Sequence, residues 1–178
     1  MKYSSIRRSA EISDCGRYRW WLRRSWNAPQ LPLESRPQPS KGACCFVMLN
    51  PSTADGTQDD PTIRRCIAFA DSWGYTSLTV RNLFAWRATD PRELFKAESV
   101  TGGERGNVEL LAACSGDLLV AAWGAGVPFG RDKEVLALWE KHFPGVPIYC
   151  LGKTKHGHPR HPLYVRGDAV PVLLKAGE

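Results

Sequence analysis

The sequence predicts an α/β fold, a three-layer sandwich in which helices cover both faces of a mostly parallel central sheet. Short apolar runs of strand length alternate along the chain with longer segments of helical periodicity. Most of the apolar runs end at a polar or glycine-rich loop, as the buried strands of α/β proteins do. No internal repeat or low-complexity tract favours another architecture. With 178 residues, of which 43% are hydrophobic and 24% charged, we expect a single domain over residues 1–178.

The first central strand is predicted at residues 45–49, where an apolar run ends abruptly at an Asn-Pro step that begins with Asn50. In an open α/β sheet, ligands bind in the crevice beyond the carboxyl ends of the strands. We therefore expect chemistry in the polar loop that follows this strand. A helix comes next, because Asp60 is a good N-cap, Pro61 suits the first helical position and Gly74 provides a stop.

Further apolar and periodic segments complete the pattern. We expect strands at residues 78–84, 118–123 and 148–151. We expect helices at residues 107–113, 131–142 and, in the tail, 168–174. Because the carboxyl ends of parallel strands meet at one edge of a sheet, four polar segments should converge there. These segments are Asn50, Asn82 with Arg87, residues 124–130 and residues 158–164.

The N-terminal part is expected to contribute a loose segment over residues 1–13 and a strand over residues 18–26, which mixes aromatic residues with arginines. Strict alternation places Tyr18, Trp20 and Leu22 on one face of this strand and, on the other, Arg17, Arg19, Trp21 and Arg23. One interpretation is an arginine and tryptophan platform for nucleic acid. An edge strand with solvated arginines is the favoured alternative. Residues 27–41, with four prolines, are expected to form a loop.

The charge balance suits a polyanionic partner such as nucleic acid. Lys and Arg total 24 against 18 acidic residues, for a net charge of +6 and a pI near 9.1. The six cysteines include no C-x-x-C pair, which favours reduced thiols in a cytoplasmic protein. No window approaches the length of a membrane span, and no apolar stretch follows the basic residues of the N-terminus. We therefore expect a soluble protein without membrane contact, and no obligate protein partner is implied.

Common cofactor and catalytic motifs are absent. The segment at residues 124–130 has the spacing G-x-G-x-x-x-G, contains Pro128, and lacks the acidic residue that binds ribose in dinucleotide-binding proteins. The sequence has no Walker A loop, no zinc-type spacing of cysteine and histidine, and no G-x-S-x-G element. We expect no cofactor and no metal.

Four segments resemble a known set of motifs in their order. MLNPS is followed by RNLFAWRATDP, LLVAAWG and HPRHPLY, over roughly residues 44–164. This order resembles the motif set of the uracil-DNA glycosylase superfamily, and it implies a uracil-DNA glycosylase-like fold with DNA as the partner. The segments NPSTAD, DPTIRRC, NLFAWRATDP and HPLY also resemble DUF1643, a family of bacterial and phage domains of unknown function.

The superfamily resemblance implies roles for three residues. Asn50 would orient the attacking water or stabilise the departing base, Asn82 would hydrogen-bond the base edge, and His161 would donate to the negative charge that develops on the base. The last motif has two His-Pro steps, so His158 is an alternative to His161. Trp86 stands where one branch has a cysteine that helps hold an iron–sulfur cluster, which implies no cluster here.

Other residues near the same edge are candidates for catalysis and binding. Asp60 is expected to be occupied as an N-cap, so Asp59 or Asp55 is the candidate base for water. Candidates for contacts with a flipped base are Ser52, which replaces the usual glycine, and Phe84, Trp86 and Tyr164. Candidates for contacts with the DNA backbone or groove are Arg87, Lys153, Lys155, Arg160, His158 and Leu163.

The leading hypothesis is a DNA glycosylase that hydrolyses the N-glycosidic bond of a flipped-out damaged or modified base. The hypothesis extends to modified pyrimidines of phage DNA, which would make the enzyme a factor in antiviral defence. One alternative is hydrolysis or transfer at a free nucleoside or nucleotide. Another is a nucleic-acid-binding module without catalytic activity.

Overall fold

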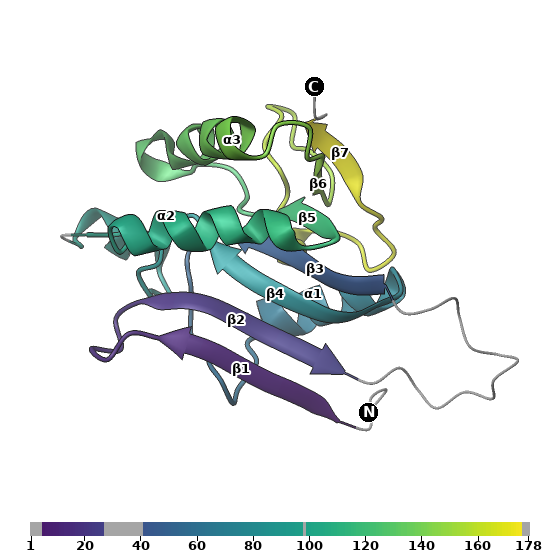
Figure 1. Cartoon of the computed structure of the whole chain (residues 1–178), viewed down its shortest axis with the longest axis horizontal. Helices are drawn as coiled ribbons and strands as arrows, with labels where there is room; N and C mark the ends of the chain where they lie inside the picture. Colours follow the sequence, from purple (N-terminus) through teal and green to yellow (C-terminus); the bar gives the residue numbers. More distant parts are fainter. Residues whose placement is uncertain (1–4, 27–40, 98, 176–178) are drawn as a thin grey trace, which may run out of the picture.

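The computed structural model describes residues 5–26, 41–97 and 99–175, which form a seven-stranded mixed sheet with three α-helices (Figure 1). The strands are β1 (Ile6–Ile12), β2 (Arg19–Trp26), β3 (Lys41–Met48), β4 (Tyr75–Asn82), β5 (Leu118–Ala121), β6 (Ile148–Cys150) and β7 (Val172–Lys175). The helices are α1 (Pro61–Ser72), α2 (Glu104–Leu111) and α3 (Arg131–His142). Two short 3-10 turns flank the site described below, η2 (Pro91–Phe95) and η5 (Pro162–Tyr164).

The strand order is β1-β2-β4-β3-β5-β6-β7. The four central strands, β4, β3, β5 and β6, are parallel, whereas β1, β2 and β7 run antiparallel to their neighbours. The α/β class is therefore confirmed, with a mixed sheet. After β3 the chain adds β4 on one side and then crosses to add β5 on the other, so the order reverses between β3 and β5. This topological switch point is where open α/β sheets bind ligands.

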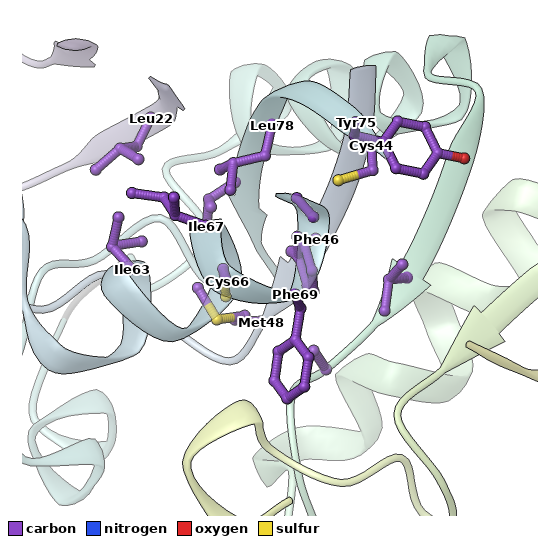
Figure 2. Packing of buried hydrophobic residues seen from close by; sticks show 14 of the residues in the cluster. Leu22, Cys44, Phe46, Met48, Ile63, Cys66, Ile67, Phe69, Tyr75 and Leu78 are labelled. Atoms are coloured by element: carbon purple, nitrogen blue, oxygen red, sulfur yellow. The ribbon is translucent and has the colours of Figure 1, made fainter. Parts of the chain in front are cut away.

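Alternate residues of β3 face two separate cores. Cys44, Phe46 and Met48 pack under α1, in a cluster that includes Ile63 and Phe69 (Figure 2). The opposite cluster is formed by residues from β3, α2, α3 and the other strands, including Cys45, Val47, Leu110, Val135 and Trp139. Figure 1 shows α1 behind the sheet and α2 and α3 in front of it. The two cores therefore separate three layers, as the strand period of two requires.

Helix α1 begins and ends where the sequence predicts. Asp60 Oδ1 accepts a hydrogen bond of 2.8 Å from the N–H of Ile63, and Pro61 occupies the first turn. Gly74 follows the helix with a φ of 87°, a left-handed conformation that favours glycine. The buried side of the helix is formed by Ile63, Cys66, Ile67, Phe69 and Ala70.

Both ends of the chain contain strands that were not predicted. The expectation of a loose segment is wrong for Ile6–Ile12, which pairs with β2, and the expected tail helix is wrong because Val172–Lys175 pairs with β6. Both strands cover edges of the sheet that would otherwise expose unpaired backbone groups. Residues 1–4 and the greater part of the expected loop, residues 27–40, lie outside the described residues.

Strand β2 departs from strict alternation. Glu11 pairs with Trp21 and Ile12 pairs with Arg19, so Trp20 is an extra residue between them, as in a β-bulge. Arg19 is therefore buried together with Leu22, although alternation would place two residues three apart on opposite faces. The favoured interpretation of β2 as an edge strand with solvated arginines is wrong for Arg19 and Arg24, because both side chains are buried.

The cysteines form no disulfide, and all six lie in the described part of the chain. Burial raises the pKa of Cys45 to about 12, so this thiol is protonated at neutral pH. None of the described helices is both long enough and apolar enough to cross a bilayer.

Candidate active site

A cavity of about 770 Å³ opens at the carboxyl ends of β3 and β5. Its wall includes Met48 and Asn50 at the end of β3, Trp123 and Gly124 after β5, and Asp60 at the start of α1. The segments around η2 and η5 complete it. The volume lies within the range of about 300–1,000 Å³ that is usual for ligand pockets. The cavity therefore has the size and, at the switch point, the place of a ligand site.

Asn50 has both of its amide N–H groups engaged. Its Nδ2 donates to the carbonyl of Ala88 at 2.8 Å and to that of Pro51 at 3.1 Å. An amide has two N–H donors, so Oδ1 is the atom of this side chain that can bind a ligand or water. Asn50 can thus accept a hydrogen bond from water, but it has no N–H left to donate to a departing base.

His161 lines the cavity, and one of its two ring nitrogens has a hydrogen-bond partner in the chain. Its Nδ1 accepts a long hydrogen bond of 3.4 Å from the N–H of Leu163, which places the proton of the neutral ring on Nε2. Burial lowers the pKa of His161, and the charge of Asp60 opposes this shift. Gly124, with a φ of 84°, lies close by, since a Cβ at this position would be 3.7 Å from the His161 Cβ.

Asp60 both caps helix α1 and lines the cavity. Oδ1 accepts the hydrogen bond from Ile63 that caps α1, as expected from the sequence. The residue also lines the cavity, which the assignment as an N-cap alone did not predict. The carboxylate of Asp60 is therefore the acidic group in the cavity wall.

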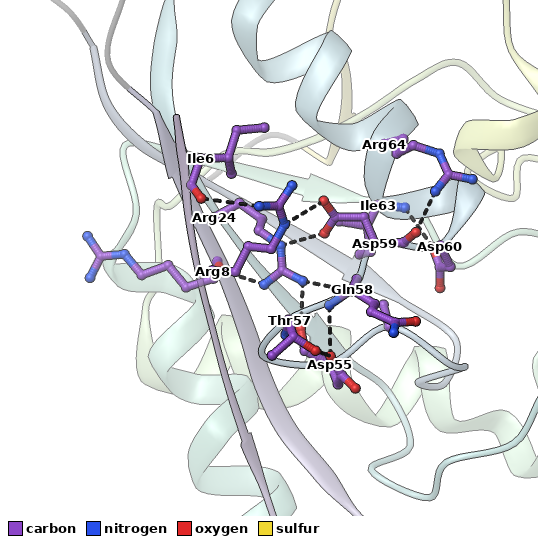
Figure 3. A network of polar contacts seen from close by, with 12 residues as sticks. Ile6, Arg8, Arg24, Asp55, Thr57, Gln58, Asp59, Asp60, Ile63 and Arg64 are labelled. Carbon is purple, nitrogen blue, oxygen red and sulfur yellow. Dashed lines mark hydrogen bonds and ion pairs between the residues drawn. The ribbon is translucent and has the colours of Figure 1, made fainter. Parts of the chain in front are cut away.

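Asp59 and Asp55 hold a loop against β2 and do not line the cavity (Figure 3). Asp59 forms ion pairs with Arg24 at 2.6 Å and with Arg8 at 3.0 Å. Asp55 Oδ1 accepts hydrogen bonds from the backbone N–H groups of Thr57 and Gln58 and from the hydroxyl of Thr57. These hydrogen bonds lower the pKa of Asp55 to about 2. The expectation that Asp59 or Asp55 activates water at this site is therefore wrong, because both carboxylates are engaged elsewhere.

Asn82 lies behind the cavity wall, and the structure does not bring it to the ligand position expected for it. Its side chain is buried, and its Oδ1 accepts a hydrogen bond of 3.2 Å from Arg19 Nη2. Arg19 itself lines the cavity. The strand end that was expected to present an amide therefore presents a guanidinium.

Three other candidates from the second strand end also lie away from the cavity. Phe84 is fully buried in the core under α2 and α3. Trp86 contacts the ring of Tyr18 edge-on, and Arg87 Nη1 donates to the carbonyl of Gly16 at 3.0 Å. These contacts give all three side chains structural partners.

The last predicted segment is divided between the cavity and its surroundings. Arg160 and Tyr164 line the cavity, as Ser52 does from the opposite loop, and Tyr164 is 78% exposed. The remaining candidates are outside the wall, namely Lys153, Lys155, His158 and Leu163. Of the two candidate histidines, His161 is therefore the one at the cavity.

Arg19 and Trp123 are among the cavity residues that the sequence analysis did not identify, as are Thr62, Thr89 and Thr154. Arg19 was placed by strict alternation, which the extra residue in β2 invalidates. Trp123 was included in a predicted strand, but β5 ends at Ala121. Among the described residues, no group of three or more His, Cys, Asp or Glu side chains is arranged to hold a metal ion.

Comparison with known proteins identifies one family. Residues 19–163 match the model of a family described as "Protein of unknown function (DUF1643)". A search of curated proteins and a search of solved structures give no match.

Proposed function

This chain belongs to the DUF1643 family, and we propose that it is a DNA glycosylase, with a uracil-DNA glycosylase-like fold, that excises a flipped-out damaged or modified base. The observation that carries the proposal is that Asn50, Asp60 and His161, from three separate segments, line one cavity at the switch point of the sheet. Their free groups are two acceptors and one donor, which match the needs of N-glycosidic bond hydrolysis.

The reaction breaks the bond between C1′ of the sugar and a nitrogen of the base. The base leaves with the bonding electrons, and the sugar becomes oxocarbenium-like. A water molecule held by Asn50 Oδ1 attacks C1′ and gives its proton to Asp60, whose charge also stabilises the cationic sugar. The Nε2–H of His161 donates a hydrogen bond to the base oxygen on which negative charge collects.

The volume of the cavity is sufficient for a base larger than uracil. A single pyrimidine ring would leave much of about 770 Å³ empty, whereas a modified pyrimidine carries extra bulk. Arg160 and the net charge of +6 suit the DNA backbone, and Tyr164 offers an exposed ring for stacking. An enzyme of this kind would act on modified phage DNA in antiviral defence.

The same volume also favours a second candidate, hydrolysis at a free nucleoside or nucleotide. A whole nucleotide would occupy the cavity without any contribution from a DNA groove. The chemistry at Asn50, Asp60 and His161 would be the same, so the two candidates differ only in substrate.

The test is to incubate the protein with duplex and single-stranded DNA containing uracil, with phage DNA carrying modified pyrimidines, and with free nucleotides. The formation of abasic sites supports the glycosylase, and release of base from nucleotides alone supports the second candidate. Asp60→Asn and Asn50→Ala should each lower the rate by about 10²–10⁴-fold. Asp132→Asn is the matched control, because Asp132 lies in the first turn of α3 and outside the cavity wall. Binding of DNA without any product would overturn the proposal in favour of a non-catalytic module.

A further inference from the structure

Arg19 is a buried cation that forms no ion pair within 4.0 Å among the described residues. Its side chain donates to the carbonyl of Ala54 at 2.9 Å and to Asn82 Oδ1 at 3.2 Å, both neutral acceptors, and its Nε has no partner. Three arginines are buried in the described part of the chain, and the other two, Arg24 and Arg131, each form an ion pair with a carboxylate. Arg19 alone among these three lacks one.

A buried charge is costly unless it is paired, because it has lost its water and gained no opposite charge. Burial lowers the pKa of Arg19 to about 10, a shift that the charge of Asp60 partly opposes, so the guanidinium stays protonated at neutral pH. Arg19 is 2% exposed, and it forms part of the cavity wall. A buried guanidinium in the cavity wall that has only neutral hydrogen-bond partners is suited to bind a negatively charged oxygen of a ligand.

The local backbone directs this side chain to the cavity. The extra residue in β2 turns Arg19 to the face on which Leu22 and Ala54 pack, instead of the opposite face. Bulges of this kind occur next to functional sites, where they redirect a side chain. Asn82 then holds the guanidinium from behind, and its own Nδ2 is buried without a partner.

We infer that Arg19 binds an oxygen of the ligand that carries or gains negative charge, and that Asn82 is a positioning residue for Arg19. In the proposed glycosylase, on which this identification of the ligand rests, the oxygen is a carbonyl of the departing base. In a nucleotide it is a phosphate oxygen. Both are acceptors to which a guanidinium donates strong, charge-assisted hydrogen bonds.

The decisive variant is Asn82→Asp, which puts a carboxylate where Arg19 now has a neutral acceptor. The internal ion pair should keep the urea midpoint of unfolding at or above that of wild type, since it gives the buried guanidinium an ion-pair partner. The same pair should compete with the ligand, so binding should weaken at least tenfold. In Asn82→Ala both stability and binding should fall. A purely structural role for Asn82 predicts instead that stability and binding change in the same direction in both variants.

Binding is measured by calorimetry with three probes, which are free uracil, inorganic phosphate and deoxyuridine monophosphate. Weaker binding of uracil in Asn82→Asp and Arg19→Met identifies the base carbonyl as the bound group, and weaker binding of phosphate identifies the phosphate. The inference is overturned if wild type binds none of the probes, or if Asn82→Asp binds them as wild type does. Because no turnover is needed, a protein that binds a probe through Arg19 but never releases a base refutes only the glycosylase. Conversely, unchanged base release in Asn82→Asp refutes only this inference.

Discussion

The ion pair between Arg24 and Asp59 predicts a large loss of stability for the substitution Asp59→Asn. The Arg24 side chain is fully buried, and that of Asp59 is 8% exposed. Removing one partner of a buried pair leaves the other charge uncompensated, at a cost of about 3–5 kcal/mol. Arg24 keeps its hydrogen bonds to four backbone carbonyls, so we expect the lower end of this range, about 3 kcal/mol. This is a large part of the stability of about 5–15 kcal/mol that a domain has.

The free energy of unfolding in urea measures this loss. The double variant Arg24→Met with Asp59→Leu should lose less stability than the sum of the losses in the two single variants, because both substitutions remove the same ion pair. Asp168→Asn is the matched control, since it breaks the exposed pair with Arg166 and should change nothing measurable. If Asp59→Asn were as harmless as Asp168→Asn, the assignment of Asp59 to a structural ion pair would be refuted.

Three further predictions concern the cavity wall. Asp60→Ala should lower the free energy of unfolding by about 1 kcal/mol, whereas Asp60→Asn should preserve it because asparagine also caps helices; equal losses in urea would contradict the cap. Burial lowers the pKa of His161, so the unfolded chain binds a proton at this residue more readily than the folded chain does. Wild type should therefore lose stability relative to His161→Asn as the pH falls below about 6.5. A stability difference between the two proteins that is constant from pH 7 to pH 5 would contradict this. Gly124→Ala should cost about 1–2 kcal/mol, because the φ of 84° is unfavourable for alanine; an unchanged thermal midpoint would show that the loop adapts.

The elements that sequence reasoning located best have local signals. Helix α1 is determined by signals at its own two ends, the N-cap and proline at its start and the glycine after its last turn, and the structure confirms its start at Pro61 and its end before Gly74. Strands β3, β5 and β6 contain short apolar runs that stand out from their surroundings, whereas β4 has apolar residues alternating with polar ones. Their positions followed within a few residues.

The elements that were not predicted from the sequence depend on pairing between segments that are distant in the chain. Strand β1 has charged residues among its apolar ones, and it exists because β2 offers it a partner. The same holds for β7, which pairs with β6. The extra residue at Trp20 depends on the register of two strands, which no local pattern encodes. For that reason the orientation of Arg19 could not be predicted.

The site shows the same division. The structure places Asn50 and His161, from two of the four expected segments, in one cavity wall, whereas Asn82 from the second strand end is not part of it. The sequence does not indicate which side chain at each strand end reaches the cavity, because this depends on which residues of other segments pack between that side chain and the cavity. Asn82 is at a predicted position, but Arg19 from another strand covers it.

The hydrogen-bonding groups of the cavity support the proposed hydrolysis better than they support simple anion binding. A phosphate site needs donors and positive charge, and Arg19, Arg160 and the Nε2–H of His161 would satisfy it. Asp60 would not, because a carboxylate in the same wall repels a phosphate. Asn50 would not either, since both of its N–H groups are engaged and only an acceptor is left. A reaction in which water gives up a proton while negative charge collects on a leaving group uses acceptors and donors together, and this is the combination that the wall contains.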